Sequence, residues 1–138
     1  MTSELLTWYE EGAFTPVVQG STSAGTATYA AQAGSYTRIG RLVHFQIYVV
    51  WSAGSGTGNL QVGGLPFVSG AGGLAYGGGF TPVLLDVALA ANNYCSGAYI
   101  PSGDTAMRFY QTPIGGGTAS AVAYDAAGEV MIVGQYFV

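Results

Sequence analysis

The clearest pattern of apolar and polar residues runs from Arg41 to Ser52. Every second side chain there is large and apolar: Val43, Phe45, Ile47, Val49 and Trp51. Successive side chains of a β-strand point to opposite faces, so this alternation predicts a strand with one face in the core. The opposite face carries Leu42, His44, Gln46, Tyr48 and Val50. That mixture is too apolar for free exposure and too polar for a monomer's core, so we expect an interface between subunits.

Shorter apolar runs separated by glycine predict further strands, and no run repeats apolar residues with the period of a helix. The expected strands are 14–19, 26–32, 35–39, 59–62, 83–90, 95–100, 106–111, 120–124 and 129–138. The last run is apolar on both faces, which is typical of a central strand buried on both sides. This spacing favours an all-β fold, a single-domain antiparallel β-sandwich of jelly-roll-like type.

Length and composition point to one domain that associates with copies of itself. The chain has 138 residues, a usual length for a single domain. Of these, 49% are hydrophobic and only 7% are charged, against about 25% charged in ordinary soluble domains. So little charge leaves apolar surface that must be hidden in another way, and burial between identical subunits is the simplest.

The composition also argues against several classes of protein. No stretch approaches the ~18 apolar residues of a transmembrane helix, so we expect no membrane insertion. An isoelectric point near 4.4 and only three arginines exclude nucleic acid as a partner. The single cysteine, Cys95, and the single histidine, His44, exclude disulfide and zinc scaffolds. We expect Cys95 to be a small buried apolar residue. The first eight residues lack the pattern of a signal peptide.

The sequence predicts neither a catalytic site nor a bound metal or cofactor. A serine nucleophile would need His44 as base and a carboxylate to orient it, and none lies near His44 in the sequence. Asp104, Asp125 and Glu129 could offer oxygens to calcium, but no dense acidic loop is present. Neither glycine triplet, 77–79 or 115–117, is followed by the Lys-Ser/Thr pair of a phosphate-binding loop, so both are expected in turns.

Aromatic residues are the best candidates for ligand contacts. Most of the ten tyrosines and two tryptophans are expected to pack, but aromatic faces also bind sugars and anchor interfaces. Residues 70–79 contain six glycines, typical either of a mobile loop or of close backbone approach. The predicted ligand-binding residues lie in this loop and around the turn at residue 92: Tyr76, Asn92, Asn93, Tyr94, Tyr99 and Asp104.

Several motifs together resemble those of a known family. They are Tyr9-Glu-Glu-Gly-Ala-Phe-Thr-Pro16, Gly34-Ser-Tyr-Thr-Arg-Ile-Gly40, Ser55-Gly-Thr-Gly-Asn-Leu60 and Gly64-Leu-Pro-Phe67. In order and spacing this set resembles the C-terminal domain of tailed-phage tail fibres and tailspikes, over about residues 8–70. The first motif of that family usually reads Tyr-Glu-Glu-Gly-Thr-Trp-Thr-Pro, so Ala13 and Phe14 replace Thr-Trp here.

The resemblance implies a trimer that follows a fibre shaft or β-helix. It implies a docking segment at residues 1–12, with contacts from Leu5, Leu6, Trp8 and Tyr9, ahead of a sandwich domain at residues 13–138. Glu10 and Glu11 could pair with Arg38 or Arg41 at such a junction, or could simply be solvated. Since Met1 lies eight residues before the motif, the chain is a stand-alone virion protein, an internal-start product or a fragment, and the sequence leaves these open.

Two functions follow as hypotheses. The first is a non-enzymatic trimeric tip domain of a tail fibre, which binds a host-surface glycan or protein through three copies of a shallow site. The second is a purely structural virion component, either a trimerisation clamp for a fibre or a decoration protein on the capsid surface. The expected partners are the chain itself, other virion proteins and a host glycan or receptor. An enzyme such as a depolymerase or esterase ranks third, because in the family the chemistry belongs to neighbouring β-helices.

Overall fold

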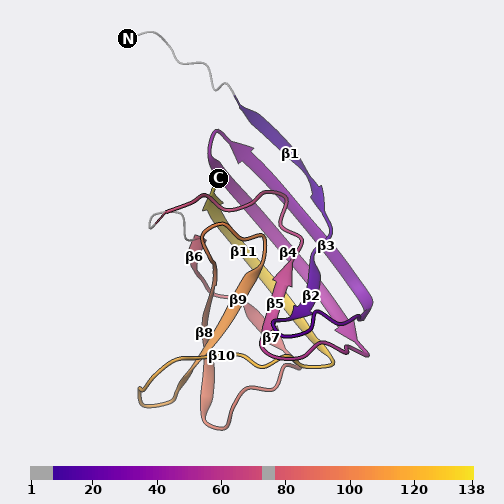
Figure 1. The fold of residues 1–138 in the computed structure, drawn as a ribbon, viewed down its shortest axis with the longest axis vertical. Helices are drawn as coiled ribbons and strands as arrows, with labels where there is room; N and C mark the ends of the chain where they lie inside the picture. The colour runs from indigo at the N-terminus through magenta and orange to yellow at the C-terminus, as the bar shows by residue number, and fades with distance from the viewer. Residues whose placement is uncertain (1–7, 73–76) are drawn as a thin grey trace.

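The computed structural model describes residues 8–72 and 77–138, which fold into two antiparallel sheets packed face to face (Figure 1). Sheet A contains, in spatial order, β1 (Tyr9–Phe14), β3 (Thr28–Ile39), β4 (Leu42–Ser52), β11 (Gly128–Phe137) and β7 (Val83–Leu85). Sheet B contains β2 (Val17–Gly20), β5 (Leu60–Gly63), β9 (Met107–Pro113), β8 (Asn93–Ile100) and β6 (Gly77–Phe80), with β10 (Ser120–Ala121) beside β9. The predicted all-β sandwich is confirmed, while its jelly-roll subtype and its trimeric state stay predictions.

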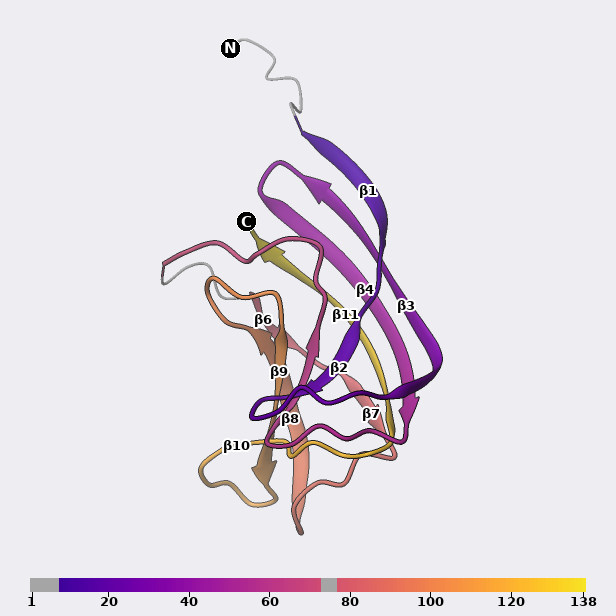
Figure 2. The same ribbon diagram turned by 45° about the vertical axis from the view of Figure 1, so that its right-hand side comes forward.

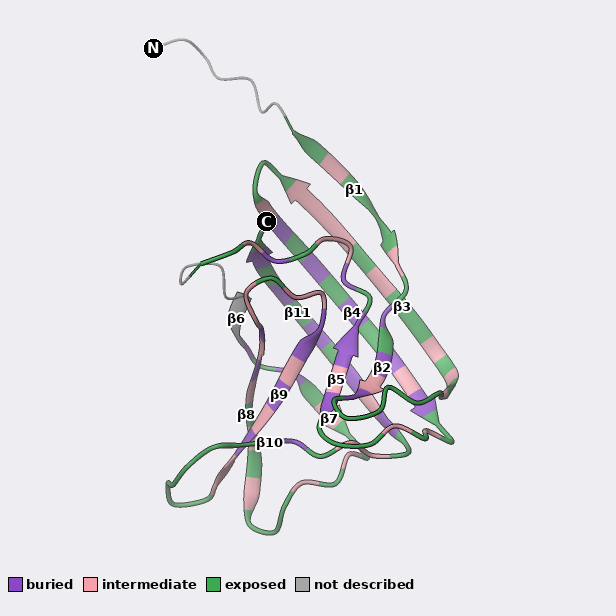
Figure 3. Cartoon of the chain, in the orientation of Figure 1, coloured by how far each residue is buried: buried purple, intermediate pink, exposed green. Residues whose placement is uncertain are grey.

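The core lies between the two sheets. Along each long strand, buried residues that point inward alternate with more exposed residues that point outward (Figure 3). All five predicted core residues of β4, from Val43 to Trp51, are at most 3% exposed, which confirms that face. Sheet B contributes Leu60, Val62, Ile100, Met107 and Phe109 from the opposite side. Phe45 of sheet A and Phe80 of sheet B meet edge to face, with ring centroids 5.4 Å apart. Within the described residues no helix is long and apolar enough to span a membrane.

Several glycines lie under aromatic rings within the sheets. A Cβ atom at Gly134 would lie 2.5 Å from ring carbons of Phe80, and one at Gly34 would lie 2.7 Å from the ring of Phe14. Because interiors are close-packed, a side chain at either position would displace the ring above it. The strands expected at 26–32 and 35–39 would leave Gly34 between them, but this glycine lies inside β3, where its missing side chain makes room for Phe14.

Several strand predictions are wrong, and the glycine triplet 77–79, which was expected in a turn, lies in β6. The two strands expected at 26–32 and 35–39 form the single strand β3, which has a bulge between Tyr29 and Ala31. The strand expected at 14–19 is divided at Thr15 and Pro16, so that its halves belong to different sheets. Proline has no amide proton to donate to the ladder, which ends β1 before residue 16. Of the strand expected at 83–90, only residues 83–85 pair.

The first described residues form an edge strand of sheet A. β1 pairs with β3 from Tyr9 to Phe14 and so crosses the expected boundary at residue 12; the docking role of this segment stays a prediction. The guanidinium of Arg38 lies between the rings of Trp8 and Phe67, 4.8 Å and 4.7 Å from their centroids. Figure 2 shows β1 beginning at this end of the molecule, towards which β11 also runs. Leu5 and Leu6 lie outside the described residues.

The two glutamates of β1 contact tyrosines. Glu10 accepts a hydrogen bond of 2.6 Å from the Tyr36 hydroxyl, and Glu11 accepts one of 2.8 Å from Tyr9. These hydrogen bonds raise the pKa of both tyrosines. Arg41 instead donates a hydrogen bond to the backbone oxygen of Val138. In the described part of the chain neither glutamate forms an ion pair with an arginine, so the expected pairing does not occur within one subunit.

Candidate binding surfaces

The outer face of sheet A carries the residues predicted as a subunit interface. Leu42, His44, Gln46, Tyr48 and Val50 all lie on this face, and the paired residues of neighbouring strands extend it in rows. One row contains Tyr9, Ile39, Leu42 and Phe137, and another contains Ala33, Tyr48, Met131 and Val83. In a single chain, Tyr48 is 43% exposed and Phe137 47%. The face therefore presents apolar side chains to its surroundings.

The expectation that the last strand is buried on both faces is wrong for the single chain. β11 is central, between β4 and β7, and its inner residues Val130, Ile132 and Tyr136 are buried. Its outer residues Met131 and Val133 are exposed, Val133 by 56%, because no other part of residues 8–72 and 77–138 covers this side of sheet A. Their apolar character has no partner within the described chain.

A polar hollow interrupts the apolar rows of sheet A. It has a volume of about 480 Å³ and is lined by Glu11, Ser35, Thr37, His44 and Gln46, among others. Sequence reasoning missed Glu11 as a neighbour of His44, because the two share a row only through the pairing of β1, β3 and β4. Among the described residues, no hydrogen bond joins His44 to a serine or a carboxylate, so the elements of a triad are near one another but not connected.

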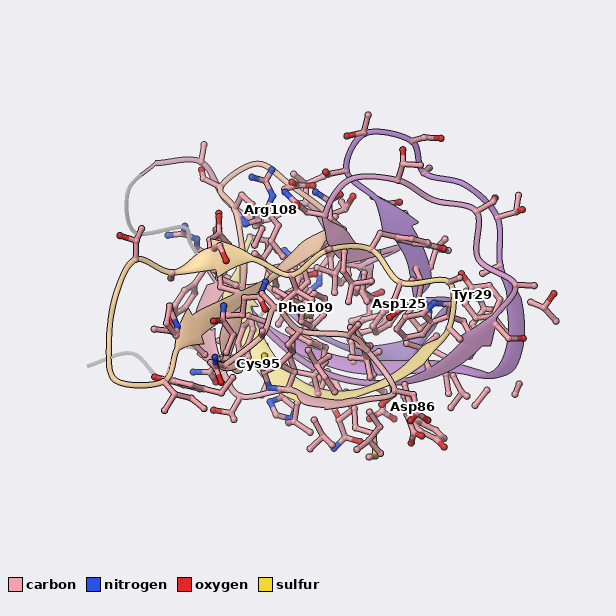
Figure 4. All side chains as sticks on the ribbon, turned by 90° about the horizontal axis from the view of Figure 1, so that it is seen from below. Tyr29, Asp86, Cys95, Arg108, Phe109 and Asp125 are labelled. Carbon is pink, nitrogen blue, oxygen red and sulfur yellow. The ribbon has the colours of Figure 1, made fainter. Side chains whose placement is uncertain are left out.

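The outer face of sheet B holds two of the predicted ligand residues, Tyr94 and Tyr99, and adds a third tyrosine, Tyr110. Tyr94 lies opposite Thr112, Tyr110 opposite Gly97, and Tyr99 opposite Arg108. The rings of Tyr99 and Tyr110 are 5.6 Å apart, and the hydrogen bond between their hydroxyls is the largest of the effects that raise the pKa of Tyr110. In Figure 4, Arg108 and Phe109 extend to opposite sides of β9, with Phe109 towards the core.

The row that contains Tyr99 and Arg108 continues across sheet B with polar side chains. Arg108 lies opposite Gln61 on β5, which lies opposite Gln19 on β2. The Gln19 amide donates a hydrogen bond of 3.2 Å to Gln61. Arg108 forms an ion pair of 3.3 Å with Asp104, so its charge is balanced on the surface. Sequence reasoning missed Tyr110, Gln61 and Arg108 because only strand register brings them together.

The remaining predicted ligand residues are not gathered into one site. Asp104 stabilises a turn, since its carboxylate accepts hydrogen bonds from the amides of Thr105 and Ala106. Asn92 occupies the turn before β8 with a φ of 59°, and Asn93 begins that strand at the end opposite Tyr99. The strand therefore separates the asparagines from Asp104. Tyr76 lies outside the described residues.

The carboxylates considered for calcium lie in different places. Asp125 accepts a hydrogen bond from the amide of Ala88, and the charge of Glu129 raises the pKa of Tyr48 on the outer face of sheet A. No group of three or more histidine, cysteine, aspartate or glutamate side chains in the described residues could hold a metal ion.

Cys95 is only partly buried, so the expectation of a small buried residue is wrong. It lies at the bulge of β8, where Ser96 is inserted between Cys95 and Gly97 and the strand bends. Burial raises the pKa of its thiol, and a hydrogen bond with the backbone of Gly97 acts in the opposite direction.

Comparison with known proteins gives one structural likeness. The sequence matches no protein-family model and no curated protein. Among solved structures, it is similar to the crystal structure of the Dettilon tailspike protein, with a TM-score of 0.70 and 21% sequence identity. The alignment covers 94% of this chain and 24% of the tailspike chain. The chain thus spans about a quarter of that protein's length, and at this identity the likeness establishes the fold alone.

Proposed function

We propose that this chain is a non-enzymatic phage tail component, a trimeric tip domain of a tail fibre or tailspike that attaches to the host surface. Copies of the chain associate through the outer face of sheet A. The outer face of sheet B then remains free to contact the bacterial surface.

The difference between the two outer faces carries this proposal. Sheet A exposes whole rows of apolar side chains, such as Tyr48 beside Met131, which cost free energy while they remain in water. Sheet B exposes tyrosines among amides, hydroxyls and a balanced ion pair, a composition suited to a reversible ligand. Similarity in fold to part of a tailspike favours the tail over the capsid surface as the location.

A purely structural role is the second candidate, and the apolar rows of sheet A favour it. A trimerisation clamp needs this interface alone and makes no use of the tyrosines on sheet B. The two functions therefore differ in whether an assembled trimer also adsorbs to cells. Labelled protein mixed with cells of the bacterium that the phage infects would separate them, because a clamp remains in the supernatant.

Light scattering tests the assembly step. The purified chain should have a mass near three times 14.1 kDa. The double variant M131E/V133E replaces two exposed apolar side chains on the outer face of β11 with carboxylates. It should give a monomer, since carboxylates buried without a partner in the interface cost ~2–5 kcal/mol. T112E, on the outer face of sheet B, is the matched control and should stay trimeric. A monomeric wild-type chain, or a trimeric double variant, would contradict this interface.

A further inference from the structure

We infer that the outer face of sheet B contains two adjoining sugar subsites separated by Tyr110, which together take an uncharged oligosaccharide. This inference deepens the proposed function and rests on it for the statement that the face is free in the virion.

The two subsites exist because Tyr110 stands between two very small side chains. In the register of sheet B, Gly97 of β8 lies on one side of Tyr110 and Ala121 of β10 on the other. Neither neighbour is large enough to cover the Tyr110 ring, so the ring forms a ridge with room for a ligand on each side.

Each side of this ridge is hollow. The first hollow has a volume of about 310 Å³ and is lined by Ser96, Gly97, Ala98, Tyr99 and Tyr110. The second, of about 250 Å³, is lined by Asn59, Gln61, Arg108, Tyr110 and Ala121, among others. Pockets for drug-sized ligands measure ~300–1,000 Å³, so each hollow suits a unit of about one sugar ring.

The lining of both hollows fits a sugar. The apolar faces of the Tyr99 and Tyr110 rings can stack on the carbon face of a pyranose. Around them, the hydroxyl of Ser96 and the side-chain amides of Asn59 and Gln61 can donate to or accept from sugar hydroxyls.

The charge of the face indicates an uncharged ligand. The sole cation in the two linings is Arg108, and Asp104 already neutralises it at 3.3 Å. An acidic sugar would have to compete with this carboxylate. The hollows lie on the two sides of β9, about two strand spacings or ~10 Å apart, so one oligosaccharide crossing the strands over Tyr110 can occupy both.

The experiment begins with an array of defined oligosaccharides, some neutral and some bearing uronic or sialic acids, followed by calorimetric titration of the best neutral binder. Y110A removes the surface on which both sugar rings stack and should lower affinity at least tenfold, as expected for loss of a central aromatic contact. Y110F keeps the ring and should stay within about threefold of wild type. A121L fills the second hollow and should lower affinity for the oligosaccharide, whereas A127L, an exposed alanine in the following loop, should not.

The outcomes separate this inference from the proposed function. If wild-type protein binds only acidic glycans, or if Y110A and A121L bind like wild type, the two-subsite assignment is overturned. If the protein adsorbs to host cells while Y110A adsorbs equally well, host attachment stands but uses another surface, such as one that binds a protein receptor. If array binding depends on Tyr110 but no adsorption to host cells occurs, the sugar site stands and the attachment function fails.

Discussion

Tyr136 allows a sharp test of how the sandwich is held together. Its side chain is only 1% exposed, and its hydroxyl donates to the carbonyl of Phe67 at 3.0 Å and accepts from the amide of Phe67 at 3.2 Å. Y136F removes both bonds and leaves two backbone groups without these partners. At about 0.5–1.5 kcal/mol for each net hydrogen bond, the variant should lose ~1–3 kcal/mol at pH 7. For a domain of this size that is a fall in Tm of roughly 4–10 °C.

The difference in free energy of unfolding between wild type and Y136F should also depend on pH. Burial raises the pKa of Tyr136 to about 12, against an ordinary value of 10.0. The folded state therefore holds the proton more tightly than the unfolded state, so this stabilisation is complete below pH 10 and is lost as the pH rises towards 12. Y136F lacks the ionisable hydroxyl at this position. The difference in free energy of unfolding between wild type and Y136F should therefore become smaller between pH 10 and 12.

Urea unfolding followed by circular dichroism at fixed protein concentration measures both effects. Y94F, which alters an exposed tyrosine, serves as the control and should differ from wild type by less than ~0.5 kcal/mol. Equal stability of Y136F and wild type at pH 7, or a gap that stays constant up to pH 12, would refute the reasoning.

Three further outcomes are expected. G134A places a Cβ atom 2.5 Å from the Phe80 ring and should cost ~1–3 kcal/mol; in a double-mutant cycle F80L should relieve part of this loss, and strict additivity would contradict the contact. In a W51F background, R38A should make Trp8 fluorescence more accessible to acrylamide and cost about 0.5–1 kcal/mol, because the stacked guanidinium is gone. The Cys95 thiol, whose pKa burial raises, should react with a disulfide reagent more slowly in native than in urea-unfolded protein at pH 8.

The sequence predicts the core of this fold well because the signal is local. Alternation along β4 has a period of two residues, so it identifies inner and outer faces without knowledge of any other strand. β11 shows the limit of such reasoning. An apolar outer face looks the same in sequence whether its own chain covers it or another copy does. From the sequence we expected β11 to be covered by its own chain, whereas its outer face is exposed in the single chain.

For the candidate site on sheet B, the sequence predicted Tyr99 but not Tyr110, and the reason differs from that for β11. Tyr110 lies in a predicted strand and has no unusual neighbours in sequence. Its prominence depends on Gly97 and Ala121, which flank it only after β8 and β10 pair with β9. The bulge at Ser96 also shifts the register of β8, and no simple alternation could place Gly97 beside Tyr110.

If assembly uses sheet A and binding uses sheet B, as proposed, the two faces should differ in how many substitutions they tolerate. On β9 the buried Phe109 belongs to the core, while its neighbours Arg108 and Tyr110 lie on the outer face, where Arg108 pairs with Asp104. Substituting the outer residues leaves the inner face intact, so the hollows can be reshaped at little cost in stability. On sheet A, by contrast, an outer residue such as Val133 would face its equivalents or neighbours in other copies. A single change there is repeated at every interface, so this face is expected to tolerate far less variation than the tyrosine face.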